Sequence, residues 1–193
     1  MKKQLATQIN LLQYMIESDD LNRTVNTIIH ELSGSLFNGL PLLVFGNGGS
    51  AADALHISGE LVGKFHENRK ALNVVCLNSN AVIMTAWSND FSYDSVFERQ
   101  VQAHGIKGGF AWGISTSGNS KSVILGLRRA QAIGMRTIGM TGSSGGSIKD
   151  HSDFLINVPT SETPRVQELH LPIYHYICQE VEKKLFQSSQ INQ

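Results

Sequence analysis

The first forty residues contain two runs of apolar residues at helical spacing. The first run ends at the acidic pair Asp19-Asp20, and its apolar positions are Leu5, Ile9, Leu12 and Ile16. The second follows directly, with apolar positions Leu21, Val25, Ile28, Ile29, Leu32 and Leu36. Both predict amphipathic helices, which bury their apolar faces on the domain's own sheet or on a neighbouring subunit. Residues 1–38 are therefore assigned to N-terminal helices.

Beyond these helices, short apolar runs alternate with helix-like segments. The predicted strands are 42–45, 72–77, 110–114, 137–140 and 154–158, and the predicted helices are 51–62, 81–87, 121–133 and 166–185. This alternation is typical of βαβ units, which build a parallel sheet with helices on both faces. Five strands fit a doubly wound, flavodoxin-like α/β fold, in which ligands bind at the carboxyl ends of the strands.

The pattern predicts a single domain, with an α/β core over 39–186 and a tail over 187–193. Pro172 lies inside the last predicted helix, where it removes one N–H donor and is expected to kink the helix or to mark its first turn.

Composition narrows the class of protein. With 193 residues, 41% hydrophobic and 17% charged, the chain is typical of one globular domain. Lys+Arg and Asp+Glu both number 16, so no basic excess indicates a nucleic-acid partner. No stretch approaches the roughly 18 apolar residues of a membrane span, and the N-terminus lacks the apolar core of a signal peptide. We expect a cytoplasmic protein in which Cys76 and Cys178 are buried free thiols, because their spacing suits no metal.

The loop after the first predicted strand reads Gly46-Asn47-Gly48-Gly49-Ser50. Glycines allow the backbone to approach a ligand closely, and the helix that follows offers free N–H groups and a positive dipole end to an anion. The same residues also suit a tight turn with Ser50 as the helix cap.

The loop after the third predicted strand reads Ser115-Thr116-Ser117-Gly118-Asn119-Ser120. Its hydroxyls donate to phosphate oxygens without a lysine, whereas a capped turn explains only one serine. Because both loops fall at the same end of a parallel sheet, they predict a phosphorylated ligand. A third Gly/Ser loop, 141–147, is equally well explained as a flexible turn.

Two helices carry candidate catalytic side chains. His56 and Glu60 share one helix face, one turn apart, in the helix that begins at the first loop, although a structural or exposed pair has the same spacing. Gln167 and His175 lie two turns apart on the last helix, and spacing does not separate them from the competitors Glu168, His170 and Glu180.

Two further groups of polar residues remain ambiguous. Asp90, after Asn89, suits either a helix cap or a contact with sugar hydroxyls. The basic run of Lys64, His66, Arg69 and Lys70 is expected to be a solvated face.

Four segments, in this order, closely resemble the sedoheptulose 7-phosphate isomerases, or phosphoheptose isomerases, of the sugar-isomerase (SIS) superfamily. They read GNGGSAADALHISGEL, SNDFSYDSVFERQV, ISTSGNS and RVQELHLPIYH, and the resemblance extends over about 42–185. It implies a homotetramer with active sites shared between subunits. It also implies conversion of sedoheptulose 7-phosphate to glycero-manno-heptose 7-phosphate through an enediol, for lipopolysaccharide or capsule.

The resemblance also implies roles for individual residues. Glu60 and His175 match the acid/base pair, and Asn89-Asp90 matches a sugar-binding position. The implied phosphate cradle is Ser115, Thr116, Ser117 and Ser120, beside first-loop ligands at Asn47, Gly48, Gly49 and Ser50. The ligands of zinc-containing members correspond to His56, Glu60, Gln167 and His175, of which Gln167 and Glu60 would also contact substrate.

Zinc would act as a Lewis acid, but a zinc-bound Glu60 is a poorer free base, so its two roles compete. The chain departs from its relatives at Lys64, where many have Arg, and at Ser88, where Gly is common. Ala51-Ala52 replaces the His-Cys of one subgroup. None of these departures removes a proposed catalytic group.

Other functions are compatible with the fold that the resemblance implies. SIS relatives include phosphosugar-sensing domains and tetrameric partners of a replication initiator, and the loops would also suit an isomerase of aminosugar or pentose phosphates. The presence of both Glu60 and His175 favours an enzyme, because binding alone needs no acid/base pair.

Overall fold

The computed structural model describes the backbone of residues 1–191 and the side chains of residues 1–187. Its α-helices are α1 (Lys2–Glu17), α2 (Asp19–Phe37), α3 (Gly49–Val62), α4 (Ala81–Asp90), α5 (Val96–His104), α6 (Lys121–Ile133) and α7 (Thr163–Ile191). Its strands are β1 (Leu42–Gly46), β2 (Val74–Cys76), β3 (Phe110–Ile114), β4 (Arg136–Thr141) and β5 (Phe154–Asn157). Two 3-10 turns, η1 (Tyr93–Ser95) and η2 (Ser147–His151), complete the described elements.

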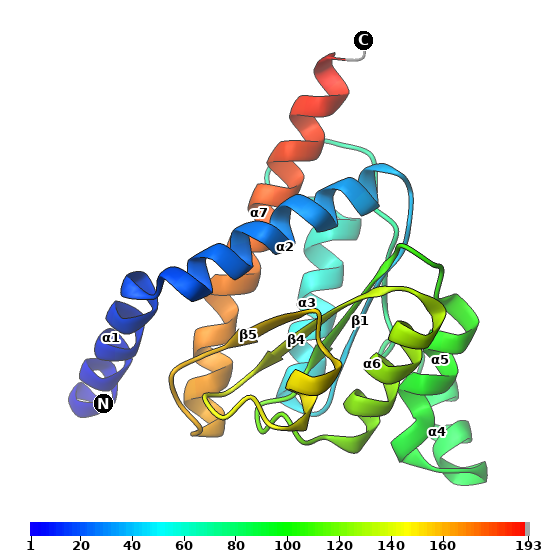
Figure 1. The fold of residues 1–193 in the computed structure, drawn as a ribbon, viewed down its shortest axis with the longest axis horizontal. Helices are drawn as coiled ribbons and strands as arrows, with labels where there is room; N and C mark the ends of the chain where they lie inside the picture. Colours follow the sequence, from blue (N-terminus) through cyan, green and yellow to red (C-terminus); the bar gives the residue numbers. More distant parts are fainter. Residues whose placement is uncertain (192–193) are drawn as a thin grey trace.

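The five strands form one parallel sheet in the order β2-β1-β3-β4-β5. This order confirms the predicted doubly wound, flavodoxin-like α/β fold. The connection reverses direction beside β1, so the loops after β1 and β3 lie next to each other at the carboxyl edge of the sheet (Figure 1). The fold therefore brings together the two loops that the sequence selects as anion-binding.

Alternating side chains of the strands fill two separate cores. Leu42 and Val44 of β1 belong to the cluster that also contains residues of α2, α3 and α7. Leu43 and Phe45 point to the opposite face and pack with residues of α5 and α6. All four side chains are fully buried, as expected for a parallel sheet covered on both sides.

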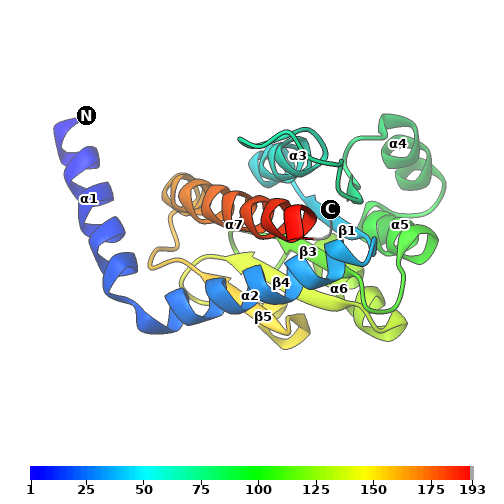
Figure 2. The same ribbon diagram turned by 90° about the horizontal axis from the view of Figure 1, so that it is seen from above.

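The N-terminal helices are confirmed, with the break at Ser18 and not at the acidic pair. The Ser18 hydroxyl accepts from the N–H of Leu21, so Ser18 caps α2, and Asp19-Asp20 occupies the first turn, where negative charge is favourable. Helix α1 extends away from the sheet while α2 packs along it (Figures 1 and 2).

Three differences from the predicted elements concern helices. Helix α5 was not predicted, although Val96, Phe97 and Val101 share one helix face, because it is only nine residues long. Helix α7 continues through Pro172, so this residue does not mark a first turn. It also continues to Ile191 through most of the predicted tail, and residues 192–193 lie outside the described part.

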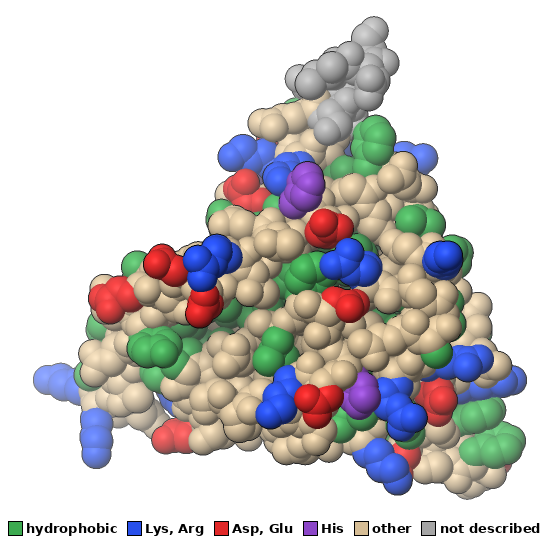
Figure 3. All heavy atoms as spheres, viewed as in Figure 1, with side chains coloured by type: hydrophobic (Ala, Val, Ile, Leu, Met, Phe, Trp, Pro, Cys, Tyr) green, Lys and Arg blue, Asp and Glu red, His purple; other side chains and the backbone are tan. Residues whose placement is uncertain are grey.

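The surface and the cysteines agree with the composition. Figure 3 shows basic and acidic side chains intermingled over the face it displays. Among the described residues, no helix is sufficiently long and apolar to cross a bilayer. Both Cys76 and Cys178 are buried free thiols, as predicted.

His170 is a fully buried histidine of α7 that anchors the end of β4. Its Nε2–H donates to the carbonyl oxygen of Thr141 at 3.3 Å. Burial disfavours the charged ring and lowers its pKa from 6.5 to about 4. It follows that the unfolded chain binds a proton more readily than the folded protein between these two pH values, and that folding stability falls as pH decreases through this window.

We expect the free energy of unfolding of the wild type to fall, through this residue, by about 2 kcal/mol between pH 8 and pH 5. A His170→Gln variant keeps an N–H donor but does not titrate, so its stability should fall less. Urea unfolding of both proteins at the two pH values measures the difference. Equal losses in the two proteins would contradict the assignment.

Candidate functional site

Helices α3 and α7 lie side by side and run in the same direction (Figure 1). Both follow strands of one parallel sheet and return antiparallel to them, which makes the two helices parallel to each other. A Cβ on Gly49 would lie against the Gln167 amide, and about two turns further along, His56 faces Tyr174 and His175. The residues of the site therefore lie close together because the two parallel helices rise by the same distance per residue.

Three side chains of these helices converge on one point. Nε2 of His56 lies 3.0 Å from Oε1 of Glu60 and 3.4 Å from Nε2 of His175. Their ligand atoms all lie within 4.8 Å of one another. The His56 and Glu60 side chains are 43% and 24% exposed, so the cluster is open to solvent on one side. We call His56, Glu60 and His175 the triad.

The electrostatics of the triad favour a neutral His175. Partial burial lowers its pKa, proximity to His56 lowers it further, and Glu60 opposes the shift. A neutral imidazole at pH 7 has one unprotonated nitrogen, which is able to take a proton or to ligate a metal.

Two residues that the sequence did not indicate fix the other side of the His56 ring. The Tyr174 hydroxyl lies 3.0 Å from Nδ1 of His56 and 3.5 Å from Oδ1 of Asp53. Burial raises the pKa of Asp53 to about 6, although the Tyr174 hydrogen bond and His56 lower it. Burial and the nearby Asp53 raise the pKa of Tyr174, which therefore remains a neutral hydroxyl. Their signals were present, since Asp53 precedes His56 by one turn and Tyr174 adjoins His175.

This arrangement allows two tautomers of His56. In one, Nε2–H donates to Glu60 and Nδ1 accepts from the Tyr174 hydroxyl. A metal ion on Nε2 requires the other, in which Nδ1–H donates to Tyr174 and the hydroxyl donates to Asp53. The Tyr174 hydroxyl serves both states because it is both donor and acceptor.

The triad is a suitable donor set for a metal ion. Two imidazoles and a carboxylate that leave one position open are typical of catalytic zinc sites. The close approach of the three ligand atoms fits one ion without rearrangement of the helices. Gln167, the fourth predicted ligand, lies on α7 eight residues before His175, roughly 12 Å along the helix axis, with its amide against Gly49.

The first loop is held in place by neighbouring side chains. The Asn78 side chain pairs with both backbone groups of Gly46, at 3.2 and 2.8 Å. Gly48, at φ +56, is the N-cap of α3, so the alternative that Ser50 caps this helix is wrong. Asn47 accepts from the Tyr93 hydroxyl at 2.6 Å and donates to Ser122 at 2.9 Å, which connects this loop to the start of α6.

The second loop curls over the N-terminus of α6. Ser115 is buried, and its hydroxyl donates to that of Ser120 at 3.1 Å, while Ser117 is exposed. A Cβ on Gly118, at φ +68, would lie 2.3 Å from the Gly145 carbonyl oxygen. The third Gly/Ser loop therefore packs against the second, and the hydroxyls lie at a helix end that favours anions.

The remaining candidate residues lie elsewhere. Asn89 and Asp90 are exposed at the end of α4, where Ser92 and not Asp90 caps the next turn, so the capping alternative for Asp90 is wrong. Glu168 pairs with Arg165 at 2.6 Å and Glu180 with Lys183 at 3.7 Å. With His170 buried in the core, these competitors are each engaged outside the triad.

One residue of the basic run contradicts the expectation of a solvated face. Arg69 is buried in an ion pair with Glu182, whereas Lys64, His66 and Lys70 are exposed as expected.

Known proteins resemble this chain over most of its length. Residues 7–142 match the SIS domain family. A phosphoheptose isomerase of Clostridium acetobutylicum is 42% identical over 95% of this chain and 93% of its own, and that of Synechocystis sp. is 49% identical over 77% and 76%. The solved structure of phosphoheptose isomerase from Neisseria gonorrhoeae superimposes with a TM-score of 0.87, at 34% identity, over 94% of this chain and 96% of that one.

We predict that Tyr174→Phe weakens the binding of Zn²⁺ about tenfold, because the phenyl ring still packs but His56 loses its partner at Nδ1. Titration of the metal-free protein with Zn²⁺ against a chromophoric chelator measures the affinity. Tyr176→Phe, which removes a hydroxyl from an exposed ring of the same helix, is the control. Equal affinities in both variants would show that Tyr174 does not orient the triad.

Proposed function

The chain belongs to the SIS-domain phosphoheptose isomerases, and on that premise we propose that the triad is where it isomerises its substrate. The reaction is the aldose–ketose isomerisation of sedoheptulose 7-phosphate to glycero-manno-heptose 7-phosphate. One observation carries the assignment to this place: Glu60 of α3 and His175 of α7 converge on His56. A protein that only binds a phosphosugar needs no such convergence of a carboxylate and imidazoles.

The isomerisation moves one proton between neighbouring carbons and one between their oxygens. Glu60 takes a proton from C1 of the open-chain ketose, which leaves an enediol, and returns it to C2. His175 transfers the proton between the two oxygens, which its lowered pKa supports because the ring is neutral at pH 7. Oε1 of Glu60 faces His56, so the other oxygen of the carboxylate is available for the carbon-bound proton.

The phosphate binds at the second loop in this proposal. Ser115, Thr116, Ser117 and Ser120 surround the N-terminus of α6, where hydroxyls and free N–H groups attract an anion. The first loop and Gln167 lie seven to eight residues, roughly 10 Å, before the triad on α3 and α7. A seven-carbon substrate anchored by its far end would present C1 and C2 to Glu60. Exposed Asn89 and Asp90 are proposed to contact its hydroxyls.

We propose zinc as the ion that the triad binds, whereas Gln167 of α7, whose amide lies against Gly49 of the first loop, is proposed to contact the substrate there. When bound, zinc would polarise the carbonyl oxygen and stabilise the enediolate as a Lewis acid. Its ligands His56, Glu60 and His175 come from this chain's α3 and α7.

A homotetramer with shared sites is also proposed. Helix α1 extends from the body and exposes Leu5, Ile9 and Ile16, at 56%, 64% and 69%. A groove at its base is lined by apolar residues of α1, α2 and α7, namely Leu12, Met15, Leu21, Val25, Ile173 and Tyr176. A second copy of the chain would cover these surfaces. Synthesis of heptose for lipopolysaccharide or capsule in the cytoplasm is the proposed context.

We expect Glu60→Gln to lower kcat for sedoheptulose 7-phosphate by about 10²–10⁴, because the amide does not accept the carbon-bound proton. The binding of inorganic phosphate, which the second loop would hold, should remain within about twofold. Turnover followed by NMR and phosphate binding followed by calorimetry give the two values. Glu168→Gln makes the same change at a carboxylate paired with Arg165 and should be as active as wild type.

Substrate binding without turnover in the wild type would favour the sensor function instead. An unchanged kcat in Glu60→Gln would remove this residue from the proton transfer.

Removal of metal should abolish turnover if the triad binds zinc. We expect dialysis against a chelator to lower the kcat of the wild type at least tenfold and stoichiometric Zn²⁺ to restore it. The kcat of His56→Ala should not be restored by Zn²⁺, because this variant lacks one ligand. Activity that persists in protein shown to be metal-free by mass spectrometry would contradict the zinc proposal but not the acid/base roles.

A further inference from the structure

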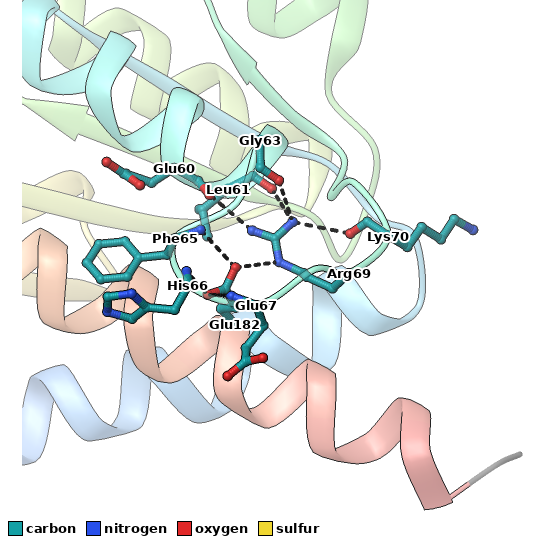
Figure 4. A network of polar contacts seen from close by, with 9 residues as sticks. All are labelled: Glu60, Leu61, Gly63, Phe65, His66, Glu67, Arg69, Lys70 and Glu182. Carbon is teal, nitrogen blue, oxygen red and sulfur yellow. Dashed lines mark hydrogen bonds and ion pairs between the residues drawn. The ribbon is translucent and has the colours of Figure 1, made fainter.

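A second charged cluster joins the same two helices beyond the triad (Figure 4). Glu182 of α7 and Arg69, which follows α3, form an ion pair with Nε 3.0 Å from Oε1. Their side chains are only 2% and 4% exposed. A buried ion pair loses much of its attraction to desolvation and is rarely needed for stability alone, so its other contacts indicate its role.

The Glu182 carboxylate binds the backbone that leaves α3. Oε1 accepts from the N–H of Phe65 at 2.9 Å, and Oε2 accepts from those of His66 at 2.6 Å and Glu67 at 3.0 Å. Burial acts to raise the pKa of Glu182, but these donors and Arg69 outweigh it and lower the pKa. The residue is therefore an anion at neutral pH, with both oxygens engaged.

The Arg69 guanidinium binds the end of α3 itself. It donates to the carbonyl oxygens of Glu60 at 3.0 Å and Leu61 at 2.8 Å, and to those of Gly63 and Lys70 at 3.3 and 3.2 Å. The last carbonyls of a helix have no partner within it, so Arg69 satisfies the C-terminal turn and complements its negative dipole end.

Both ends of this network reach the triad. The carbonyl that Arg69 holds at 3.0 Å belongs to Glu60, and the Phe65 ring, whose N–H Glu182 binds, lies 5.8 Å from the His175 ring. Glu182 follows His175 by seven residues, or about two turns, on α7. The network thus links the backbone of one triad residue to the helix that carries another.

We propose that the Glu182–Arg69 pair is a positioning device, which fixes the last turn of α3 against α7 and so sets the distance between Glu60 and His175. This inference rests on the proposed function of the triad. An apolar pair would fill the same space, but it would leave three N–H donors and the helix-end carbonyls without partners. The ion pair therefore fixes the position of the end of α3 relative to α7 as well as filling the core.

The test is Glu182→Gln in the full chain. Each oxygen of Glu182 faces N–H donors, so the amide nitrogen meets one or two of them in either orientation, and Arg69 loses its counter-charge. We expect kcat to fall ten- to a hundredfold and Zn²⁺ affinity about tenfold, while inorganic phosphate binds within about twofold of wild type. The phosphate loop is carried by β3 and α6 and should not respond.

The control is Asp153→Asn. Asp153 also accepts a backbone N–H, that of Thr137 at 2.7 Å, but at the β4–β5 edge of the sheet. It should lower stability without changing kcat or Zn²⁺ affinity. If Glu182→Gln is unstable but retains wild-type kcat and Zn²⁺ affinity, the pair is only structural and the proposal is overturned.

Arg69→Lys tests the positioning role if Glu182→Gln does not fold. Lysine keeps the charge but loses the planar fork that reaches Glu60 and Leu61, so kcat should again fall at least tenfold, with phosphate binding retained. Wild-type values in this variant would overturn the proposal. Failure of the proposed function would appear differently, as an inactive wild type, and the Zn²⁺ affinities would still test the positioning role.

Discussion

The parallel packing of α3 on α7 is the constraint on which the site depends. Along these helices, Gly49 faces Gln167, His56 faces Tyr174 and His175, and the turn after α3 binds Glu182. A slip of one helix by a single turn, about 5.4 Å, would separate every one of these pairs. The sheet order determines that the helices are neighbours, and the polar contacts between them determine their register.

The same packing explains why the proposed phosphate-binding loops and the triad lie in different parts of the molecule. The Gly- and hydroxyl-rich loops that we propose to bind the phosphate lie where β1 and β3 meet α3 and α6, at the carboxyl edge of the sheet. The triad lies further along α3, where the His56 and Glu60 side chains are only partly exposed. In the reaction that we propose, one end of the molecule would hold the phosphate and the helix pair would carry the proton transfers.

Much of the fold followed from local pattern, because buried parallel strands are continuous apolar runs and their spacing required helices between them. The strand 110–114 and the helix 121–133 were predicted with the bounds they have. Helix α5 was missed because it is only nine residues long. Helix α7 passes through Pro172 because tertiary packing outweighs one lost hydrogen bond.

The site was only partly accessible from sequence. Helical spacing paired His56 with Glu60, but His175 joined them through family resemblance, since it lies 119 residues from His56. Asp53 and Tyr174 lie near His56 and His175 in sequence, but their contact with each other spans 121 positions and was missed for the same reason. Glu182 was missed likewise, and Arg69 was grouped with exposed cations although its partner is 113 positions away. No local pattern reports a contact between segments so far apart, whereas the chemistry of a loop that binds an anion is entirely local.

We propose that α3 and α7 together assemble one metal-binding isomerase site. X-ray absorption spectroscopy of the wild-type protein loaded with one equivalent of Zn²⁺ tests it most directly, because the method identifies the atoms bound to the ion. Two imidazoles, one from each helix, and a carboxylate oxygen are expected, with the signal of one imidazole lost in each of His56→Ala and His175→Ala. A set of zinc ligands without imidazole, or one unchanged by either substitution, would show that α3 and α7 do not form this site.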